Sequence, residues 1–359
     1  MPVSPTEQLS PTQQLSPTPQ RPATEPHQVP PAVQMVQLLA GFQLSQALYA
    51  TAKLGVPDRL SGGARDARAI AADVGADAEA LRRVMRTLAA IGVFTETADG
   101  LFGLTPLGET LTQDSPASMR DLAIMWMETH YGPFGLLVDT VRTGRCAATE
   151  FYHQPFFTWL ADQPEHIARF SRAMANLTDG IKFGAIASCD FTGAGRIVDV
   201  GGADGTVLAH VLAAAPQATG IVYDLPHVVA EAEPRLASYG LGERLTLAAG
   251  DFFTAVPEGA DTYLLSMILH DWPDPEVRRL LANIKAAAPT GARLLAFELI
   301  TPDGAEPHLA KMIDLTMLGM LTGRERTEAE YRHLLQDAGF KFEAVTATPT
   351  PISVIAARA

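Results

Sequence analysis

The sequence is poor in cysteine, in long apolar runs and in positive charge. Its 359 residues include two cysteines, Cys146 and Cys189, which are far apart and fit neither a disulfide framework nor a metal-ligand spacing. No apolar run reaches the ~18–20 residues that span a bilayer. The first residues, MPVSPTEQLS, lack the basic and apolar regions of a signal peptide. We therefore expect a cytoplasmic protein without a membrane partner.

Acidic residues outnumber lysine and arginine, 40 against 27, and the formal net charge is −13. A protein that binds nucleic acid through its phosphates is usually basic, so nucleic acid is not an expected partner. Hydrophobic residues make up 47% of the chain and charged residues 19%, which is typical of a globular protein. The length is sufficient for two domains.

The first 31 residues predict a disordered tail. Residues 3–20 contain three similar hexapeptides, VSPTEQ, LSPTQQ and LSPTPQ, and the Pro/Ser/Thr/Gln-rich composition continues to about Pro31. Such a segment buries too little apolar surface to offset its ordering entropy. After the tail we expect a winged-helix-like domain at 32–115, a helical linker at 116–186 and a strand–helix domain at 187–359.

Residues 32–60 have apolar side chains at helical spacing, and a winged-helix pattern follows. The pattern comprises a helix at Ala69–Val74, a second helix capped by Asp77, and hairpin strands at Val93–Thr95 and Leu101–Leu104. Such a module either reads DNA or serves a structural or dimerisation role. The second helix carries Arg82, Arg83 and Arg86, as a recognition helix would. However, residues 64–111 contain five Arg against seven Asp/Glu, a net charge of −2, which favours the role without DNA.

Residues 116–186 are expected to be helical and are rich in methionine and aromatic residues. Such side chains at helical spacing usually form core, but at a domain junction they can line an adaptable apolar pocket. The pocket interpretation applies best to Phe170 and Met174.

From Arg196 onward the sequence alternates between strands and helices. The expected strands are RIVDVGG, GIVYDLP, RLTLAAGDFF, TYLLSMILHDW, ARLLAFELI, FKFEAVTA and ISVIAARA. Asp274 is expected to cap a helix that has Pro275 at its first position. The last two strands are joined by a connection too short for a helical crossover, so we expect them to be antiparallel. The fold class is therefore α/β, with parallel units closed by a reversed strand.

Five polar features fall at successive strand ends, roughly 20–30 residues apart, which is about one βα unit. They are the Gly201-Gly202 turn, Asp224, Asp251, His270 and Glu298. Because ligands of open α/β sheets bind outside the carboxyl ends of the strands, these residues are expected to converge on one ligand site.

Three of these features suggest an adenosine-bearing ligand. The glycine turn within Asp199–Gly205 lets the backbone approach a ligand at a helix N-terminus. Asp224 is placed to bind ribose hydroxyls, although it could instead cap the next helix. Asp251 and Phe252 could bind an exocyclic amine and stack on a purine, or could be a turn acid and a core phenylalanine. A nicotinamide dinucleotide and S-adenosylmethionine both remain possible on these grounds.

His270 lies past the apolar run LLSMIL, where a histidine can accept a proton. A lone histidine is most often structural, but Glu298 and Glu325 are candidates to orient this one and make it more basic. No residues at a metal-ligand spacing accompany it, so no metal site is expected.

The motifs VDVGGADG, YDLPHVV, GDFF, LHDWPD and GRERT followed by YRHLLQDAGF resemble the S-adenosylmethionine-dependent small-molecule O-methyltransferases of the plant caffeic-acid and bacterial polyketide type. The resemblance covers residues 33–359. It implies a Rossmann-like, seven-stranded methyltransferase domain with a reversed last strand, and a mainly helical N-terminal domain that forms a homodimer around a winged-helix core. It also implies S-adenosylmethionine as cofactor, S-adenosylhomocysteine as product, no metal, and a small aromatic acceptor with a phenolic or enolic hydroxyl.

By matching position, the resemblance implies His270 as the general base, Glu298 and Glu325 as residues that flank and orient it, and Asp271 as a residue that positions the acceptor. The implied cofactor-binding residues are Asp199, Gly201, Asp224, Leu225, Asp251, Phe252 and Ser266. The implied acceptor pocket comprises Phe170, Met174, Met317 and Met320. The sequence departs from the family pattern at Ala203, where the middle glycine of the turn is expected, and at Ser266, where many plant members carry lysine.

Two other interpretations remain. One is a relative that binds S-adenosylmethionine but performs hydroxylase-like or decarboxylase-like chemistry. The other is a winged-helix regulator that responds to a ligand. The retained His270 with its glutamates favours methyl transfer over the first, and the acidic balance disfavours the second.

Overall fold

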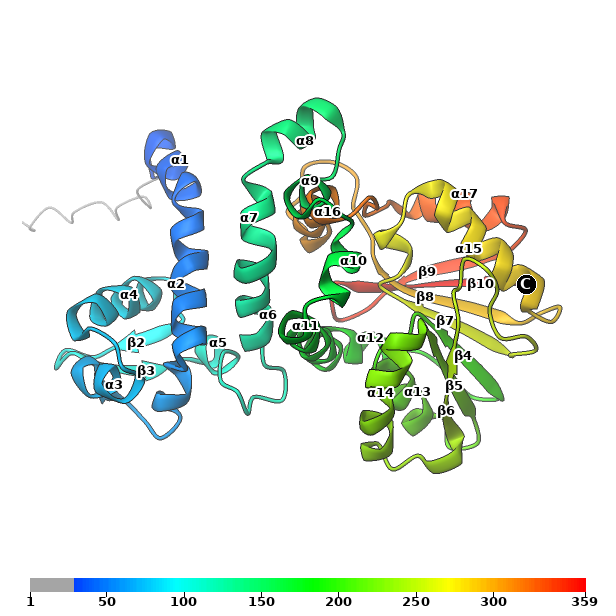
Figure 1. Cartoon of the computed structure of the whole chain (residues 1–359), viewed down its shortest axis with the longest axis horizontal. Coiled ribbons are helices and arrows are strands. Elements are labelled where there is room, and N and C mark those ends of the chain that lie inside the picture. The colour runs from blue at the N-terminus through cyan, green and yellow to red at the C-terminus, as the bar shows by residue number, and fades with distance from the viewer. Residues whose placement is uncertain (1–28) are drawn as a thin grey trace, which may run out of the picture. The chain divides into compact units, whose positions relative to one another are not determined.

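The computed structural model describes residues 29–359, so the repeat region of the predicted tail lies outside the described residues (Figure 1). Among the described residues, those up to Gln43 belong to one compact unit and Leu44–Ala359 form another. The described part of the first unit contains helix α1 (Pro31–Leu39) and the start of α2 (Gly41–Leu54). No helix within 29–359 is long and apolar enough to cross a membrane.

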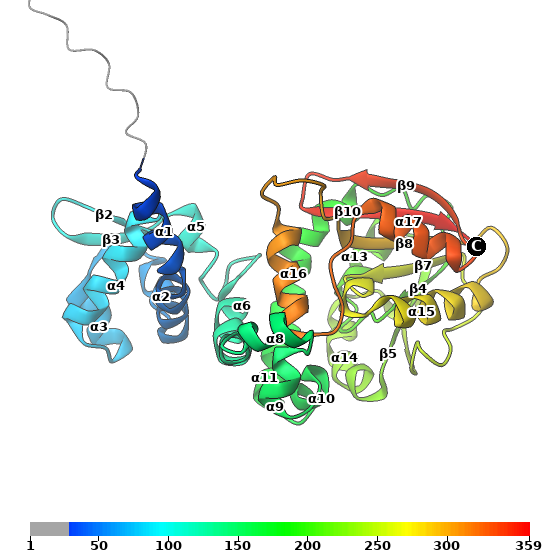
Figure 2. The same cartoon turned by 90° about the horizontal axis from the view of Figure 1, so that it is seen from above.

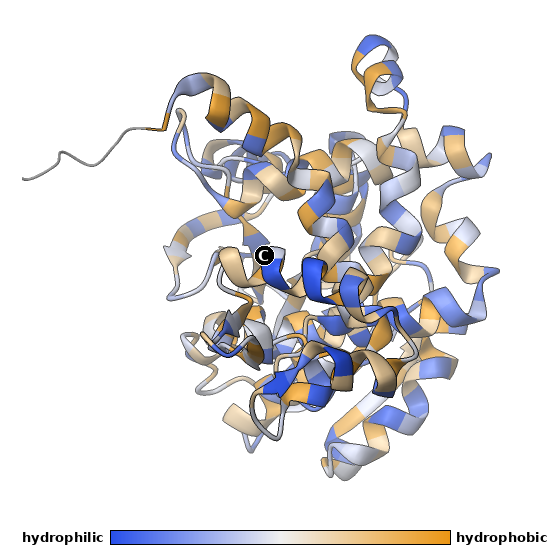
Figure 3. Cartoon of the chain, turned by 90° about the vertical axis from the view of Figure 1, so that its left-hand side faces the viewer, coloured by the Kyte–Doolittle hydropathy of each residue, from blue (hydrophilic) through white to orange (hydrophobic). Residues whose placement is uncertain are grey.

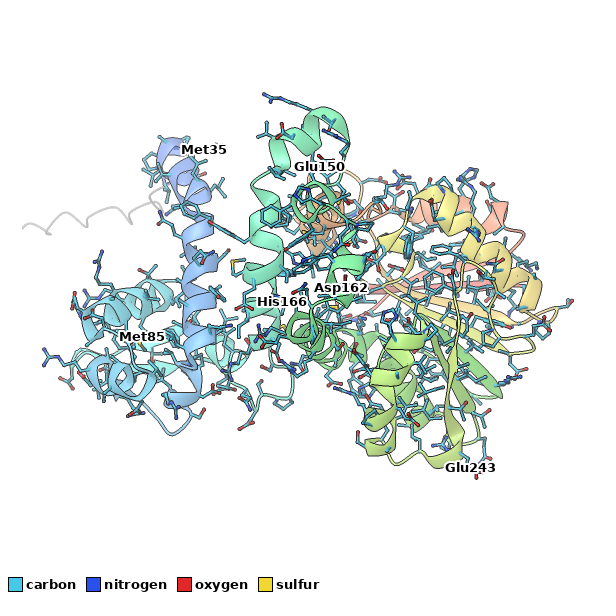
Figure 4. All side chains as sticks on the ribbon, viewed as in Figure 1. Met35, Met85, Glu150, Asp162, His166 and Glu243 are labelled. Atoms are coloured by element: carbon cyan, nitrogen blue, oxygen red, sulfur yellow. The ribbon has the colours of Figure 1, made fainter. Side chains whose placement is uncertain are left out.

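The winged-helix pattern predicted from the sequence is present at the start of the second unit. Its elements are η1 (Pro57–Leu60), β1 (Arg65–Asp66), α3 (Ala67–Val74), α4 (Ala78–Ala90), β2 (Phe94–Glu96), β3 (Leu101–Leu104) and α5 (Pro106–Glu109). Asp77 caps α4 as predicted, because its Oδ1 accepts a hydrogen bond from Ala80 N at 2.8 Å. The buried face of α4 includes Met85, which is labelled in Figure 4.

A helical region follows, as expected. Its elements are α6 (Arg120–Met125), η2 (Trp126–His130), α7 (Tyr131–Phe134), α8 (Leu137–Thr143), α9 (Ala147–Tyr152), α10 (Phe156–Ala161), α11 (Pro164–Leu177), η3 (Thr178–Lys182) and α12 (Phe183–Ala187). Both η2 and η3 are π-helical turns. Turns of this kind are rare and occur frequently at functional sites.

Seven strands form the sheet of the C-terminal region. They are β4 (Arg196–Val200), β5 (Thr219–Asp224), β6 (Leu245–Ala249), β7 (Thr262–Ser266), β8 (Arg293–Leu299), β9 (Lys341–Ala347) and β10 (Ile352–Arg358). Their spatial order is β6-β5-β4-β7-β8-β10-β9. Strand β10 is antiparallel to β8 and β9, whereas β4 to β8 pair in parallel. The predicted α/β fold with a reversed last strand is confirmed.

Helices cover both faces of this sheet. The remaining elements are α13 (Thr206–Ala214), α14 (Pro226–Ser238), η4 (Gly242–Arg244), η5 (Leu269–Asp271), α15 (Asp274–Ala287), α16 (Leu309–Met320) and α17 (Glu328–Asp337). One core cluster joins the sheet to α12 and α13, and the other joins it to α15 and α17. Helices α15 and α17 lie side by side (Figure 2). Because both faces are buried, the central strands read as continuous apolar runs.

Two local predictions around the His270 turn were wrong. The fourth strand of the prediction ends at Ser266 rather than continuing through the apolar run, because Met267 has a positive φ of 56° that no strand accommodates. Asp274 does not cap α15, since Pro273 is the N-cap residue. The Asp274 carboxylate instead accepts a hydrogen bond from Arg326 at 2.8 Å.

Helix α1 has an exposed apolar surface. Its exposed apolar side chains, with their exposed fractions, are Val33 (47%), Met35 (55%), Val36 (63%), Leu38 (75%) and Leu39 (69%). In Figure 3 the helix that follows the grey trace carries orange segments, the colour of hydrophobic residues. Apolar patches of this kind mark protein–protein contacts, and the expected homodimer would cover this one.

We expect the double substitution Leu38→Glu/Leu39→Glu to shift the protein from dimer to monomer, because it places two charges in a desolvated apolar contact. Sedimentation velocity over a concentration series measures the shift. Gln37→Glu adds a charge at another exposed position of α1 and is the control. Unchanged sedimentation of the double variant would show that α1 lies outside the dimer contact.

Candidate active site

The strand order creates a topological switch point between β4 and β7. The chain runs from β4 to β5 and β6 on one side, and then returns to β7 and β8 on the other. Ligands of such sheets bind at this point, outside the carboxyl ends of the strands. The Gly201-Gly202 turn follows β4 and the His270 turn follows β7, so the two features that the sequence singled out are neighbours.

The glycine turn packs closely against the His270 turn. Gly201 has a φ of 74°, and a Cβ at this position would lie 2.6 Å from Ile268 Cδ1. A Cβ at Gly202 would lie 2.8 Å from Asp199 Oδ2. Ala203 also has a positive φ, 48°. An alanine at the position where the family pattern has glycine therefore adds backbone strain of about 1–2 kcal/mol.

Asp224 is fixed to the glycine turn. Its Oδ2 accepts a hydrogen bond from Ala203 N at 3.0 Å, and its Oδ1 accepts one from Leu225 N at 2.7 Å. Helix α14 has Leu225 at its N-cap, with no side-chain cap. The capping alternative for Asp224 is therefore wrong. Burial raises the pKa of Asp224, and Leu225 exposes 41% of its surface at the same sheet edge.

Asp251 and Phe252 partly match the simpler of the two interpretations, in which they are a turn acid and a packed phenylalanine. Asp251 Oδ1 accepts a hydrogen bond from Phe253 N at 2.8 Å, which organises the turn after β6. The Phe252 ring packs against Phe253 and Trp272, with centroids 4.7 and 6.0 Å apart. Both residues nevertheless lie at the expected edge of the sheet.

His270 lies in the turn η5 and exposes 5% of its surface. Its Nδ1 is 2.7 Å from Glu325 Oε1, and its Nε2 is 3.3 Å from Asp271 Oδ1. Burial raises the pKa of Glu325 to about 8 and that of Asp271 to about 6. The imidazole thus has a glutamate on one nitrogen and an aspartate beside the other.

Glu298 has a different position from the one expected. Its Oε1 accepts hydrogen bonds from the backbone N–H groups of Ile268 at 3.1 Å and Leu269 at 2.8 Å. It therefore holds the backbone that leads into His270, whereas Glu325 forms the hydrogen bond with the ring. Glu298 is completely buried, and burial raises its pKa to about 7.

The sequence analysis missed Arg326. This arginine is completely buried and donates hydrogen bonds at 2.8 Å to Leu269 O, Trp272 O and Asp274 Oδ1. These acceptors lie on both sides of His270, so Arg326 fixes the shape of the turn. A Cβ at Gly323 would overlap the His270 carbonyl, which shows how closely the GRERT segment packs on this turn. The one sequence feature that pointed to Arg326 was its position in the GRERT motif.

Several buried polar atoms at this edge have no hydrogen-bond partner within the described part of the chain. They are both carboxylate oxygens of Asp199, the hydroxyl of Ser266, and one oxygen each of Glu298 and Glu325. Burial raises the pKa of Asp199 to about 7. Unpaired polar groups of this kind are rare in proteins, and a polar or cationic ligand would satisfy them.

Lys182, at the end of the turn η3, was also missed. Burial lowers the pKa of its ammonium, and Asp199, Glu298, Asp204 and Asp271 oppose that shift. The Lys182 ammonium therefore interacts electrostatically both with acids at the glycine turn and with acids at the His270 turn. No motif marks this lysine in the sequence.

The predicted acceptor residues come from α11 and α16. Phe170 and Met320 belong to one apolar cluster with Phe156, Leu160 and Phe134. Met317 is buried outside this cluster, and Met174 is partly buried on α11. Helix α16 also carries Asp314, whose Oδ1 accepts a hydrogen bond from Glu325 N at 2.9 Å. The structure thus links the apolar cluster to the His270–Glu325 pair. Among residues 29–359, no group of three or more potential ligands could hold a metal ion.

Known protein families and relatives define the class of this protein. Residues 134–341 match the O-methyltransferase domain, and residues 36–114 match the O-methyltransferase dimerisation domain. A phenazine O-methyltransferase of Lysobacter antibioticus is 38% identical over 330 residues, or 92% of this chain and 97% of the relative. An 8-amino-8-demethylriboflavin N,N-dimethyltransferase of Streptomyces davaonensis is 37% identical over 328 residues, or 89% and 93%.

Solved structures agree with this assignment. An O-methyltransferase from neocarzinostatin biosynthesis, in complex with S-adenosylmethionine and 2-hydroxy-5-methyl naphthoic acid, matches with a TM-score of 0.74 and 32% identity. The match covers 88% of this chain and 95% of that one. The chain therefore belongs to the S-adenosylmethionine-dependent O-methyltransferases that carry an N-terminal dimerisation domain. The unpaired acids and the close-packed glycine turn fit this cationic cofactor.

We expect Glu298→Gln to stabilise the protein increasingly as pH rises. The raised pKa means that the folded state holds a proton that the unfolded state releases above about 4.5, so wild-type stability falls as pH rises toward about 7. This penalty is on the order of 3 kcal/mol at most, and the amide oxygen of glutamine can still accept the two backbone hydrogen bonds.

Urea unfolding at pH 5 and pH 8 measures this effect as the difference between variant and wild type. The exposed Glu243, labelled in Figure 4, provides the control Glu243→Gln. An equal difference at both pH values for Glu298→Gln would contradict the buried, protonated state of Glu298.

Proposed function

We propose that the enzyme methylates a phenolic or enolic hydroxyl of a small aromatic acceptor, with His270 as the general base. The main support for this proposal is the hydrogen-bond geometry of the His270 imidazole. Glu325 occupies Nδ1, which leaves Nε2 to receive the acceptor proton. Glu325 is the positioning residue for the ring, and Glu298 and Arg326 position the turn.

The acidity of the acceptor hydroxyl determines the free-energy cost of proton transfer to His270. A phenol has a pKa of about 10 and an ordinary histidine about 6.5, so full proton transfer costs roughly 5 kcal/mol. Asp271 and Glu325 stabilise the imidazolium that forms, which offsets part of this cost. An aliphatic hydroxyl, with a pKa near that of water at ~15.7, would cost more than twice as much. Phenols and enols are therefore the favoured acceptors.

S-adenosylmethionine supplies the methyl group, bonded to a positively charged sulfur. In this proposal Gly201, Asp224 and Leu225 bind its nucleoside part together with Asp251 and Phe252. Asp199 and Ser266, whose polar atoms are unpaired, bind its amino-acid part. Residues 187–359 then form the cofactor-binding domain, and the linker 116–186 contributes to the acceptor site.

The apolar cluster around Phe156, which is rich in aromatic rings and is called the aromatic cluster below, favours a flat acceptor. Phe170 and Met320 pack with further aromatic side chains, and such surfaces suit planar apolar ligands. The relatives are named for phenazine, riboflavin and naphthoic acid substrates, all fused aromatic systems. We infer that Asp271 aligns the acceptor hydroxyl, and that Met174 and Met317 complete the pocket.

Two alternatives are less well supported. As a DNA reader, the winged helix would use the arginines of α4, but two of the three form ion pairs, Arg86 with Glu96 at 3.1 Å and Arg82 with Glu79 at 3.2 Å. A relative without methyl transfer, or one that methylates a neutral amine, has less need of a base. The His270–Glu325 hydrogen bond favours a hydroxyl acceptor.

We expect His270→Gln to lower kcat by 10²–10⁴-fold, the range typical of a general base, and to change S-adenosylmethionine affinity little. Mass spectrometry of a phenolic panel detects the added CH₂, and calorimetry measures cofactor binding. His333→Gln, at an exposed position, is the control. Normal turnover by His270→Gln would refute the base assignment, and a wild-type enzyme without activity on any phenol would refute the acceptor class.

We expect kcat/KM for the acceptor to rise with pH through the pKa of Glu325 and to level off about one pH unit above it. Glu325 must lose its proton to accept the Nδ1 hydrogen and leave Nε2 free, and burial raises its pKa to about 8. The cationic cofactor lowers this value, so the plateau begins earlier at saturating S-adenosylmethionine. Glu325→Gln should remove this rise. A wild-type profile that is flat from pH 6 to 8 would disprove the titration.

A further inference from the structure

A second histidine, His130, lies beside the aromatic cluster. It ends the π-helical turn η2, and its ring packs edge-on against Phe156 with centroids 5.4 Å apart. Phe156 in turn packs against Phe170 and belongs to the cluster that contains Met320. His130 is therefore separated from the predicted acceptor residues by a single aromatic ring.

The hydrogen bonds of Thr129 fix which nitrogen of His130 carries the hydrogen. Thr129 Oγ1 lies 2.7 Å from Met125 O and 2.7 Å from His130 Nδ1. A carbonyl cannot donate, so the single hydroxyl hydrogen must lie between Oγ1 and Met125 O. His130 Nδ1 must then donate to Oγ1, because two lone pairs would otherwise face each other at hydrogen-bond distance.

The other nitrogen of His130 is left as an acceptor. Burial lowers the pKa of His130 to about 4, so the ring is neutral near pH 7 and Nε2 carries no hydrogen. No hydrogen bond to Nε2 is formed by any residue in the described part of the chain. Part of the His130 surface remains accessible, and Nε2 is not among the fully enclosed polar atoms. An accessible acceptor on a ring that contacts Trp126 and Phe156 is suited to accept a hydrogen bond from a ligand.

We propose that His130 Nε2 accepts a hydrogen bond from an N–H or O–H substituent of the aromatic acceptor, separate from the hydroxyl that is methylated. This inference rests on the proposed function and narrows its substrate class to aminophenol-like and polyhydroxylated aromatic rings. A methyl substituent at that position cannot donate and leaves the Nε2 lone pair without a partner. His130 thus determines specificity, whereas His270 handles the proton.

The tautomer is tested directly by long-range ¹H–¹⁵N NMR of histidine-labelled protein, with His130→Gln to assign the signal. We expect the Nδ1–H form in the wild type and in Thr129→Ser, which keeps the hydroxyl. Thr129→Val removes the acceptor of Nδ1–H, and we expect the signal to shift toward the other tautomer. A charged ring or an Nε2–H form in the wild type would overturn the inference without affecting the proposed function.

The contact between His130 and the substrate is tested with pairs of naphthols. Each pair contains one aminonaphthol isomer and the methylnaphthol that has CH₃ in place of its NH₂ group. We expect the wild type to favour the amino compound in kcat/KM for at least one isomer. His130→Phe keeps the ring shape but removes the acceptor, and we expect it to lower this preference about tenfold. His130→Gln places an amide oxygen near the Nε2 position and should retain most of it.

An equal amino-to-methyl ratio in all three proteins, for every isomer, would overturn the inference. The same ratio is measured by calorimetry as binding to the enzyme–S-adenosylhomocysteine complex. Naphthols that bind with the expected preference but are not methylated would refute the proposed function and support the His130 contact.

Discussion

The position of His270 depends on one buried cation, Arg326. A buried guanidinium that lacks acceptors is strongly destabilising, and Arg326 satisfies its hydrogens on the backbone of the turn and on Asp274. These contacts lie before and after His270, so the turn cannot change shape without leaving a buried charge unpaired. Glu325 is the preceding residue in the sequence. The contact that fixes the turn therefore also fixes the glutamate that binds the imidazole.

The same region contains buried acids that oppose folding. Burial raises the pKa values of Asp199, Asp271, Glu298 and Glu325, which means that ionising each of them in the folded protein costs free energy. Such an arrangement is unfavourable for stability but suits a cationic ligand, because each raised pKa falls when a positive charge arrives. Active sites commonly show this opposition between stability and function.

The sequence predicted those parts of the site that follow from strand geometry. The Gly201 turn, Asp224 and His270 could be placed together because the carboxyl ends of parallel strands share one edge. Residues whose role depends on tertiary contacts could not be predicted. Asp274 has the features of a helix cap, and its actual partner, Arg326, lies in a segment about 50 residues later. The positive φ of Met267 likewise has no signature within an apolar run, so the end of β7 was misplaced. For Asp251 and Phe252 the sequence posed alternatives that are compatible, since a turn acid and a packed ring can also contact a ligand.

The two residues missed in the helical region share one physical cause. His130 is the last residue of η2 and Lys182 is the last residue of η3, and both turns are π-helical. A π turn adds a residue to the helical repeat, so the side chains after it leave the face that a 3.6-residue period assigns to them. An analysis of apolar periodicity therefore finds a continuous helix and no special position. In the structure, these interruptions place an imidazole beside Phe156 and an ammonium near the acids of the glycine turn and the His270 turn. The register shift therefore explains how a helical region can place polar side chains that its apolar periodicity does not mark.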